Sequence, residues 1–142
     1  MPHRSLFIET AGAGLYGVTR ETSAALVEMA DGRDGLLTVF VRHTSCSLLI
    51  QENADPDVCR DLEQFFARLV PPADDPSMDY LRHTAEGADD MPAHIKTALT
   101  QTSLGIPVAK GRMLFGTWQG LYLFEHRARP HRREVVCQFL AG

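Results

Sequence analysis

The sequence predicts an α+β protein with a largely antiparallel, sandwich-like β core and two or three helices. Segments with the short, β-branched pattern of strands outnumber those with helical periodicity, and the two kinds do not alternate as parallel βαβ units do. The chain has 142 residues, which fits a single domain, residues 1–142, with its own core. Apolar residues make up 44% and charged residues 23%. Both values are close to globular averages, so disorder is not expected.

Extended segments are expected in the first half of the chain at residues 5–10, 35–43 and 46–50. In the second of these, alternate residues share one face: Leu37, Val39, Val41 and His43. A helix is expected between the first two segments. Thr22 or Ser23 is its predicted N-cap, and Asp31-Gly32 ends it.

The clearest helix follows Asp55, which is the predicted N-cap, with Pro56 at the first helical position. Its apolar residues form one stripe: Val58, Leu62, Phe65, Phe66 and Leu69. We expect this stripe to lie in the core, where it would contribute on the order of 10 kcal/mol before conformational entropy is subtracted. Pro71-Pro72 ends the helix, and residues 71–79 are expected to form an exposed loop.

A further helix is expected from residue 90 to 102, capped by Asp89 or Asp90 and with Pro92 in its first turn. Its polar stripe consists of Asp90, His94, Thr97 and Gln101. Four strands are then expected, at residues 105–108, 112–118, 120–126 and 133–140. In the third, Glu125 shares a face with Leu121 and Leu123. A carboxylate in that phase must face a polar cavity, a cation or a subunit interface.

The histidines are the candidate metal ligands: His43, His83 and His94. Imidazole is the commonest metal ligand, and three of them leave a coordination position open for water or substrate. A divalent cation, zinc before others, is therefore one expectation. The spacing matches no compact zinc signature, so the alternative that these histidines make ordinary hydrogen bonds stays open.

Carboxylates near the histidines are candidates for orienting the imidazoles or for acting as a general base: Glu86, Asp90 and Glu125. The predicted helix start at residue 90, together with Arg112, is a candidate phosphate site. Gln119, in a Gly-Thr-Trp-Gln-Gly stretch, is expected to point its amide into a pocket. Capping, solvated turns and core packing of Trp118 are the alternatives for these features.

Several classes of function are disfavoured. The sequence has no P-loop and no GxGxxG in a βαβ setting, so no nucleotide cofactor is expected. The net charge of −4 gives no general attraction to nucleic acid, and the basic residues at 126–133 are expected to form a solvated turn rather than an RNA contact. No apolar run approaches the ~20 residues that span a bilayer. The odd, widely spaced cysteines (Cys46, Cys59 and Cys137) favour reduced thiols in the cytoplasm.

A set of short motifs occurs in order from about residue 5 to 140: HTS at 43–45, QENADPD at 51–57, RDL at 60–62, His83, EG at 86–87, DMPAHIK at 90–96, GR at 111–112, LFGTWQG at 114–120 and Glu125. With these motifs the chain resembles the YjbQ-like family, which is often labelled secondary thiamine-phosphate synthase. It departs from common members at residues 129–131 and at Cys46, neither of which belongs to the candidate site.

The resemblance implies a compact α+β protein assembled as a homotrimer, with a histidine-rich site near a subunit boundary. It also implies a weak thiamine-phosphate synthase activity on phosphorylated small molecules. In that reaction a hydroxymethylpyrimidine diphosphate is joined to a thiazole phosphate with loss of pyrophosphate. A non-catalytic trimer that binds a metal or metabolite is the alternative, since the same residues would serve it.

Overall fold

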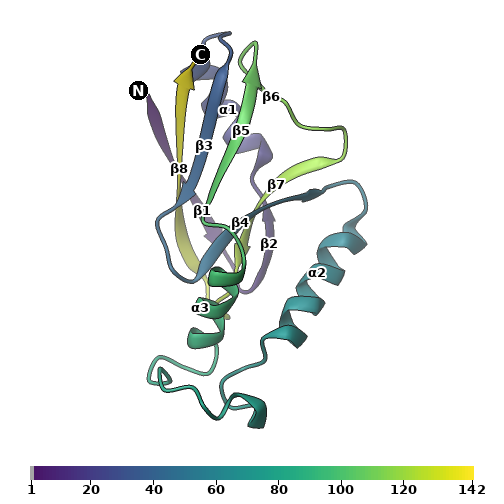
Figure 1. The fold of residues 1–142 in the computed structure, drawn as a ribbon, viewed down its shortest axis with the longest axis vertical. Coiled ribbons are helices and arrows are strands. Elements are labelled where there is room, and N and C mark those ends of the chain that lie inside the picture. Colours follow the sequence, from purple (N-terminus) through teal and green to yellow (C-terminus); the bar gives the residue numbers. More distant parts are fainter. Residues whose placement is uncertain (1) are drawn as a thin grey trace.

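Two antiparallel sheets share one hydrophobic core in the computed structural model, which describes residues 2–142 (Figure 1). The larger sheet has the strand order β1-β8-β3-β5-β6 and the smaller one β2-β7-β4. Three α-helices and a short 3-10 helix complete the fold, so the predicted α+β class with a largely antiparallel core is confirmed. The elements are β1 (His3–Thr10), β2 (Gly14–Gly17), α1 (Thr19–Ala30), β3 (Gly35–Val41), β4 (Cys46–Glu52), α2 (Pro56–Leu69), η1 (Pro76–Met78), α3 (Asp90–Leu99), β5 (Ser103–Ala109), β6 (Arg112–Met113), β7 (Gln119–Glu125) and β8 (His131–Ala141).

The chain passes between the two sheets at one end of the sandwich. Residues 11–13 join β1 to β2, residues 42–45 join β3 to β4, and residues 126–130 join β7 to β8. The strand registers place these connections together, because Glu125 lies opposite both Gly14 and Cys46 in the smaller sheet. In the larger sheet, β8 pairs with both β1 and β3 close to its start. We call this end of the sandwich the crossing end.

Helix α1 covers part of the core but does not begin where the sequence predicts. It starts at Thr19, no side chain caps its first turn, and Thr22 is buried within the helix rather than at its end. The predicted stop is correct: Asp31 has a left-handed backbone conformation, with φ of 49°. The predicted cap was wrong because Val18, the residue before the helix, is held by its own backbone N–H bond to Leu121 in β7. That contact lies far away in sequence.

Helix α2 has the predicted bounds and cap, since the Asp55 side chain accepts a hydrogen bond from the Asp57 N–H at 2.9 Å. It is not part of the core. None of its residues is buried, and the side chains of Phe65 and Leu69 are 57% and 52% exposed. Figure 1 shows α2 beside the sandwich, and Phe66 packs edge-on against Phe124 with the ring centroids 5.3 Å apart. The expectation that this stripe is buried by its own chain is therefore wrong.

Other boundaries differ in smaller ways. Helix α3 ends at Leu99, and β6 has two residues where a seven-residue strand was predicted. Residues 71–79 contain η1, whose Met78 is buried, so this segment is not wholly an exposed loop. Cys46 and Cys137 are buried and all three cysteines are free, as expected. Within residues 2–142 no helix combines the length and apolar composition needed to cross a membrane.

Candidate functional site

Two histidines and an aspartate converge at the start of α3. The His83 Nε2 donates to Asp90 Oδ2 at 2.7 Å, and the His94 Nε2 lies 3.3 Å from the same oxygen. One potential ligand atom from each of these residues lies within 4.8 Å of the other two. Two imidazoles and one carboxylate form a donor set that suits a divalent transition metal, with further coordination positions open. We call His83, Asp90 and His94 the metal triad.

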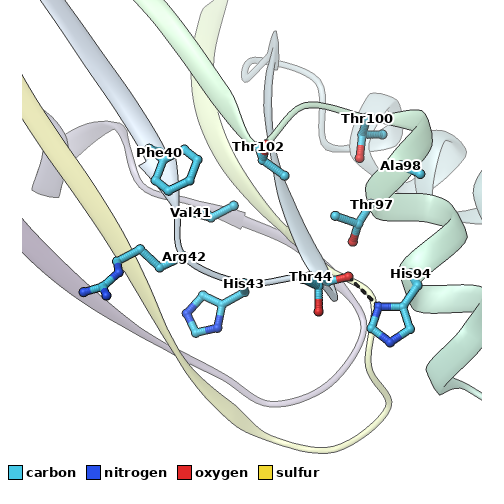
Figure 2. Close-up of a pocket in the computed structure, with 10 residues that line it drawn as sticks. All are labelled: Phe40, Val41, Arg42, His43, Thr44, His94, Thr97, Ala98, Thr100 and Thr102. Atoms are coloured by element: carbon cyan, nitrogen blue, oxygen red, sulfur yellow. Dashed lines mark hydrogen bonds between the residues drawn. The ribbon is translucent and has the colours of Figure 1, made fainter.

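The surroundings hold two members of the metal triad in a ligating orientation. His94 Nδ1 donates to the Thr44 carbonyl at 2.8 Å, which fixes the tautomer and leaves the Nε2 lone pair directed to the triad (Figure 2). Asp90 Oδ1 accepts a hydrogen bond from Arg127 Nη1 at 2.7 Å, which turns Oδ2 toward the two histidines. Thr44 belongs to one connection at the crossing end and Arg127 to another. The triad is therefore anchored to the point where the chain passes between the sheets.

Asp90 is buried, and burial alone would raise the pKa of its carboxyl. The hydrogen bond from His83, with the nearby His94 and Arg127, more than offsets burial and lowers that pKa below its ordinary value. The carboxylate is thus ionised near neutral pH, as a metal ligand must be.

Neither Asp89 nor Asp90 caps α3, contrary to the sequence prediction. No side-chain cap bond is present at this helix start. Asp89 Oδ2 instead accepts hydrogen bonds from Arg127 Nε at 2.9 Å and from the Ala128 N–H at 2.8 Å. Both carboxylates are turned toward the β7–β8 connection because a guanidinium there pairs with each of them.

Arg127 is the functional residue that the sequence prediction missed. Its side chain is only 17% exposed, and its hydrogen bond to Asp89, the first of several acidic contacts, raises its pKa. The basic residues at 126–133 were expected to form a solvated turn, and this is wrong for His126 and Arg133, which are buried, and for Arg127. The sequence did contain one indication that Arg127 points inward: residue 127 continues the alternation that places Leu123 and Glu125 on one face of the strand.

Glu86 lies at the open side of the metal triad. Its Oε2 is 3.0 Å from His83 Nε2, and its side chain is 64% exposed. Its backbone carbonyl accepts a hydrogen bond from Arg127 Nη2 at 3.3 Å. The structure thus brings together the predicted Glu86, Asp90, His83 and His94. An exposed carboxylate at this place is able to serve as a further ligand or as a general base.

Glu125 faces a cation, which is one of the three environments expected for it. It is fully buried and pairs with buried Arg133, whose Nε donates to Oε1 at 2.7 Å. Thr10 and the backbone N–H groups of His126 and Arg127 also donate to it. Burial raises its pKa, but these hydrogen bonds, that of Arg133 first, lower it overall. With all its acceptor positions engaged, Glu125 joins β7 to β8 and is not available as a base.

His43 lies outside the metal triad. Its Nε2 accepts a hydrogen bond from the Glu134 N–H at 2.7 Å, and burial, then Arg133, lowers its pKa. In the neutral ring the proton is therefore on Nδ1, and neither nitrogen offers a free lone pair. His43 does line an open groove of about 720 Å³ between the end of β3 and α3, which His94 also lines (Figure 2). The sequence predicts His43 as a third metal ligand, but within one chain its ring is bonded to the Glu134 N–H and lies outside the metal triad.

Arg112 and Gln119 lie at the other end of the sandwich. Arg112 pairs with Ala109 in a hairpin that adjoins the start of β3, six residues before the crossing end. Six strand residues span roughly 20 Å, so Arg112 does not complete an anion site with the start of α3 in the same chain. The Gln119 amide oxygen accepts the Gly116 N–H at 2.8 Å and closes a turn, so it does not point into a pocket.

His126 is buried beside the site and stays neutral. Its Nε2 lies 2.9 Å from Ser47 Oγ, and its Nδ1 has no hydrogen-bond partner among residues 2–142. Burial, followed by the charge of Lys96, lowers its pKa to about 3. The folded protein therefore does not protonate this imidazole at any pH near neutrality.

The His126 pKa predicts an acid-sensitive stability. Between pH 6.5 and about 3 the unfolded chain binds a proton at His126 that the folded chain does not, so the free energy of unfolding decreases as the pH falls. The expected decrease from pH 7 to 5 is about 2 kcal/mol. Urea unfolding at both pH values measures it. His126→Gln, which keeps a partner for Ser47, should lose that part of the decrease, and an unchanged decrease would contradict the assignment.

Comparison with known proteins agrees with the motifs. The model of the family described as "UPF0047 protein YjbQ-like" matches residues 4–142. A UPF0047 protein of Synechocystis sp. is 55% identical, covering 92% of this chain and 86% of its own. UPF0047 protein YjbQ of Escherichia coli O157:H7 is 43% identical over 94% of each chain. A solved structure of a YjbQ/UPF0047-family protein from Clostridium acetobutylicum superposes with a TM-score of 0.79 at 30% identity, covering 99% of this chain and 100% of that one. The chain belongs to the YjbQ-like UPF0047 family.

Proposed function

We propose that this protein is an enzyme that binds a divalent cation at the metal triad and a phosphorylated small molecule in the adjoining groove. The observation that carries the proposal is the convergence of His83, Asp90 and His94 on one point, with two of them oriented by bonds to Thr44 and Arg127. The donor set fits zinc, which takes two histidines and a carboxylate in catalytic sites and keeps a position for water or substrate. Zinc is therefore the ion that we propose first.

The groove supplies the second half of the proposed site. His94 belongs to both, and the groove also presents polar groups of Arg42, His43 and Thr44 (Figure 2). The Arg42 side chain is exposed and its contact with Glu134, at 3.4 Å, is long, so the guanidinium is free to bind a phosphate. His43 Nδ1–H is a further donor. These groups take over the phosphate-binding role that the sequence assigned to Arg112.

The label of secondary thiamine-phosphate synthase that the YjbQ-like family often carries supports a finer proposal. A C–N bond would form between the methylene of a hydroxymethylpyrimidine diphosphate and the nitrogen of a thiazole phosphate, while the C–O bond to the diphosphate breaks and pyrophosphate leaves. A bound divalent cation would neutralise charge on the departing diphosphate. Arg42 and His43 would hold phosphate oxygens. The attacking thiazole nitrogen carries no proton, so the step releases none, and exposed Glu86 would serve as a further ligand of the cation.

The test is turnover by purified protein loaded with zinc. Formation of thiamine phosphate and pyrophosphate is measured for the native chain, for His94→Ala and for Arg112→Ala. We expect His94→Ala to lose activity by at least about 100-fold and Arg112→Ala to keep it. If the native chain forms no more product than His94→Ala, the synthase proposal fails. The alternative of a non-catalytic metal- or metabolite-binding protein then gains, since zinc binding would persist without turnover.

We also propose that copies of the chain assemble as the homotrimer that the family resemblance implies, in the cytoplasm, where free cysteines stay reduced. Apolar side chains exposed on α2 and on one face of the larger sheet support assembly: Phe65, Leu69, Phe7, Leu36, Phe40 and Leu140. Exposing the apolar stripe of α2 to water is unfavourable. We therefore propose that a second copy of the chain covers it.

Replacing Phe65 and Leu69 together by aspartate should convert the assembly to monomers. Two buried carboxylates without partners would make the contact strongly unfavourable, while the monomer should lose little stability because both side chains are already exposed. Sedimentation equilibrium gives the mass of each form. Gln64→Asp is the matched control: Gln64 is also exposed on α2 but is not part of the apolar stripe, so this variant should remain assembled. A native chain that is itself monomeric would refute the assembly proposal.

A further inference from the structure

A second cavity lies on the other side of α3, between that helix, α2 and the end of β7. Its volume is about 250 Å³, and it is more enclosed than the groove. No residue that lines it belongs to the metal triad or lines the groove. The side chains that give it chemical character are Glu63, Phe66, Lys96, Phe124, Glu125 and His126.

Lys96 is the cationic group of this cavity. It is half-buried, and among residues 2–142 no carboxylate oxygen lies within salt-bridge distance of its ammonium group. It follows His94 by two positions, which on a helix points it to a different face, away from the metal triad. Asp89 attracts the ammonium group from a distance but forms no ion pair with it, and a partly dehydrated ammonium without a paired counter-ion is unfavourable. An anion in the cavity would remove that penalty.

His126 adds a second unsatisfied group. The buried ring forms part of the cavity wall, its Nε2 is paired with Ser47, and its Nδ1 has no partner within the described chain. When Ser47 donates to Nε2, Nδ1 carries the proton and is a donor that needs an acceptor. Nδ1 itself is sealed beneath the cavity wall, so Lys96 is the group to which a ligand in the cavity would bind, and the buried N–H of His126 adds positive potential beneath it.

The other walls limit which anion fits. Glu63 is engaged by the Leu15 N–H at 2.8 Å, and Glu125 is neutralised by Arg133, but both carboxylates still repel a doubly charged ligand. The rings of Phe66 and Phe124, in edge-on contact, offer an apolar surface. The volume lies just below the ~300 Å³ at which pockets for drug-sized ligands begin. These features favour a small, singly charged, partly apolar ligand.

We propose that this cavity is a second ligand site that binds a small monocarboxylate with a flat apolar body, its carboxylate on Lys96 and its body against Phe66. The site is independent of the metal triad, so it does not rest on the proposed function. The cavity lies between α3 and α2, whereas the groove lies between α3 and the end of β3.

The two lysines of the chain, Lys96 and Lys110, make a direct test available. Reductive methylation with ¹³C-formaldehyde labels both, and Lys96→Met and Lys110→Met assign the two signals. Metal-free protein is titrated with benzoate up to about 10 mM, and separately with inorganic phosphate. We expect benzoate to shift the Lys96 signal saturably and leave that of Lys110, which lies in an exposed turn, in place.

Affinities of unlabelled variants complete the test. Calorimetry should show benzoate binding weakened at least about ten-fold by Lys96→Met, the loss of one charge-assisted hydrogen bond, and unchanged by Lys110→Met. Ala67→Phe, which fills the cavity from an exposed position of α2, should abolish binding while Lys96 remains. His94→Ala should bind benzoate normally. The proposal is overturned if the Lys96 signal does not move, if phosphate binds as tightly as benzoate, or if His94→Ala removes binding.

Discussion

Replacing Arg133 by methionine is expected to lower the free energy of unfolding by about 3–5 kcal/mol. The change leaves the Glu125 carboxylate fully buried without the guanidinium that now binds both of its oxygens. It also removes the donor to the Ser45 carbonyl and hydroxyl. Ser45, Glu125 and Arg133 belong to different segments of the crossing end, so one side chain stabilises two of the passages between the sheets. Urea unfolding at pH 7 measures the loss.

The pH dependence identifies the cause of that loss. The lowered pKa of Glu125 means that its ion pair stabilises the native protein above the ordinary carboxyl value of about 4.5, and that this contribution is lost as the pH falls through the lowered value. In Arg133→Met burial remains but the cation is gone, so Glu125 takes up a proton at higher pH. The difference in stability between native and variant protein should therefore be largest at neutral pH and smaller at pH 4.

Two further variants separate the buried charge from lost packing. Glu125→Gln combined with Arg133→Met removes both charges and should regain at least half of the stability that the single change loses. Arg129→Met, in the same connection but exposed, is the matched control and should change stability by no more than about 0.5 kcal/mol. A single variant as stable as this control would show that the ion pair contributes nothing.

The strands could be predicted because their patterns are local. Leu37, Val39 and Val41 alternate with outward residues, and the structure buries all three. The phase of Glu125 predicted a special environment for the same reason. Arg133 could not be named as its partner, because β7 and β8 lie in different sheets and no sequence spacing encodes a contact across a connection between sheets.

Two predictions differ from the structure for separate physical reasons. The apolar stripe of α2 correctly predicts that the helix has an apolar face. Such a periodic pattern does not say whether the same chain or another molecule covers that face. In the sequence His43 continues the alternation of Leu37, Val39 and Val41, which predicts the same face of the strand. The strand ends at Val41, however, and the chain then turns toward β4. The ring therefore meets the Glu134 N–H instead of the metal triad. The position of His43 could not be predicted because a strand pattern ends with the strand, and this site is built from connections beyond the strand ends.

The largest functional effect is expected from the metal triad itself. Asp90→Ala and His94→Ala should each weaken zinc binding by more than about 100-fold, because each removes one of three ligands, and even groups that only orient ligands are worth 10–100-fold. Zinc affinity measured by competition with a chromophoric chelator gives the number. Asp90→Ala also frees Arg127 of one partner, so circular dichroism must first show that the variant is folded.

His43→Ala decides between the two arrangements of the site. The sequence pattern made His43 a ligand, whereas the structure engages its Nε2 with a backbone N–H outside the metal triad. We therefore expect His43→Ala to keep native zinc affinity, and His83→Ala to lose it as His94→Ala does. Equal losses in all three histidine variants would show that His43 turns toward the ion when zinc binds. Native affinity in all three would remove the metal centre altogether, and with it the reason that Arg127 and Thr44 hold Asp90 and His94 in their present orientations.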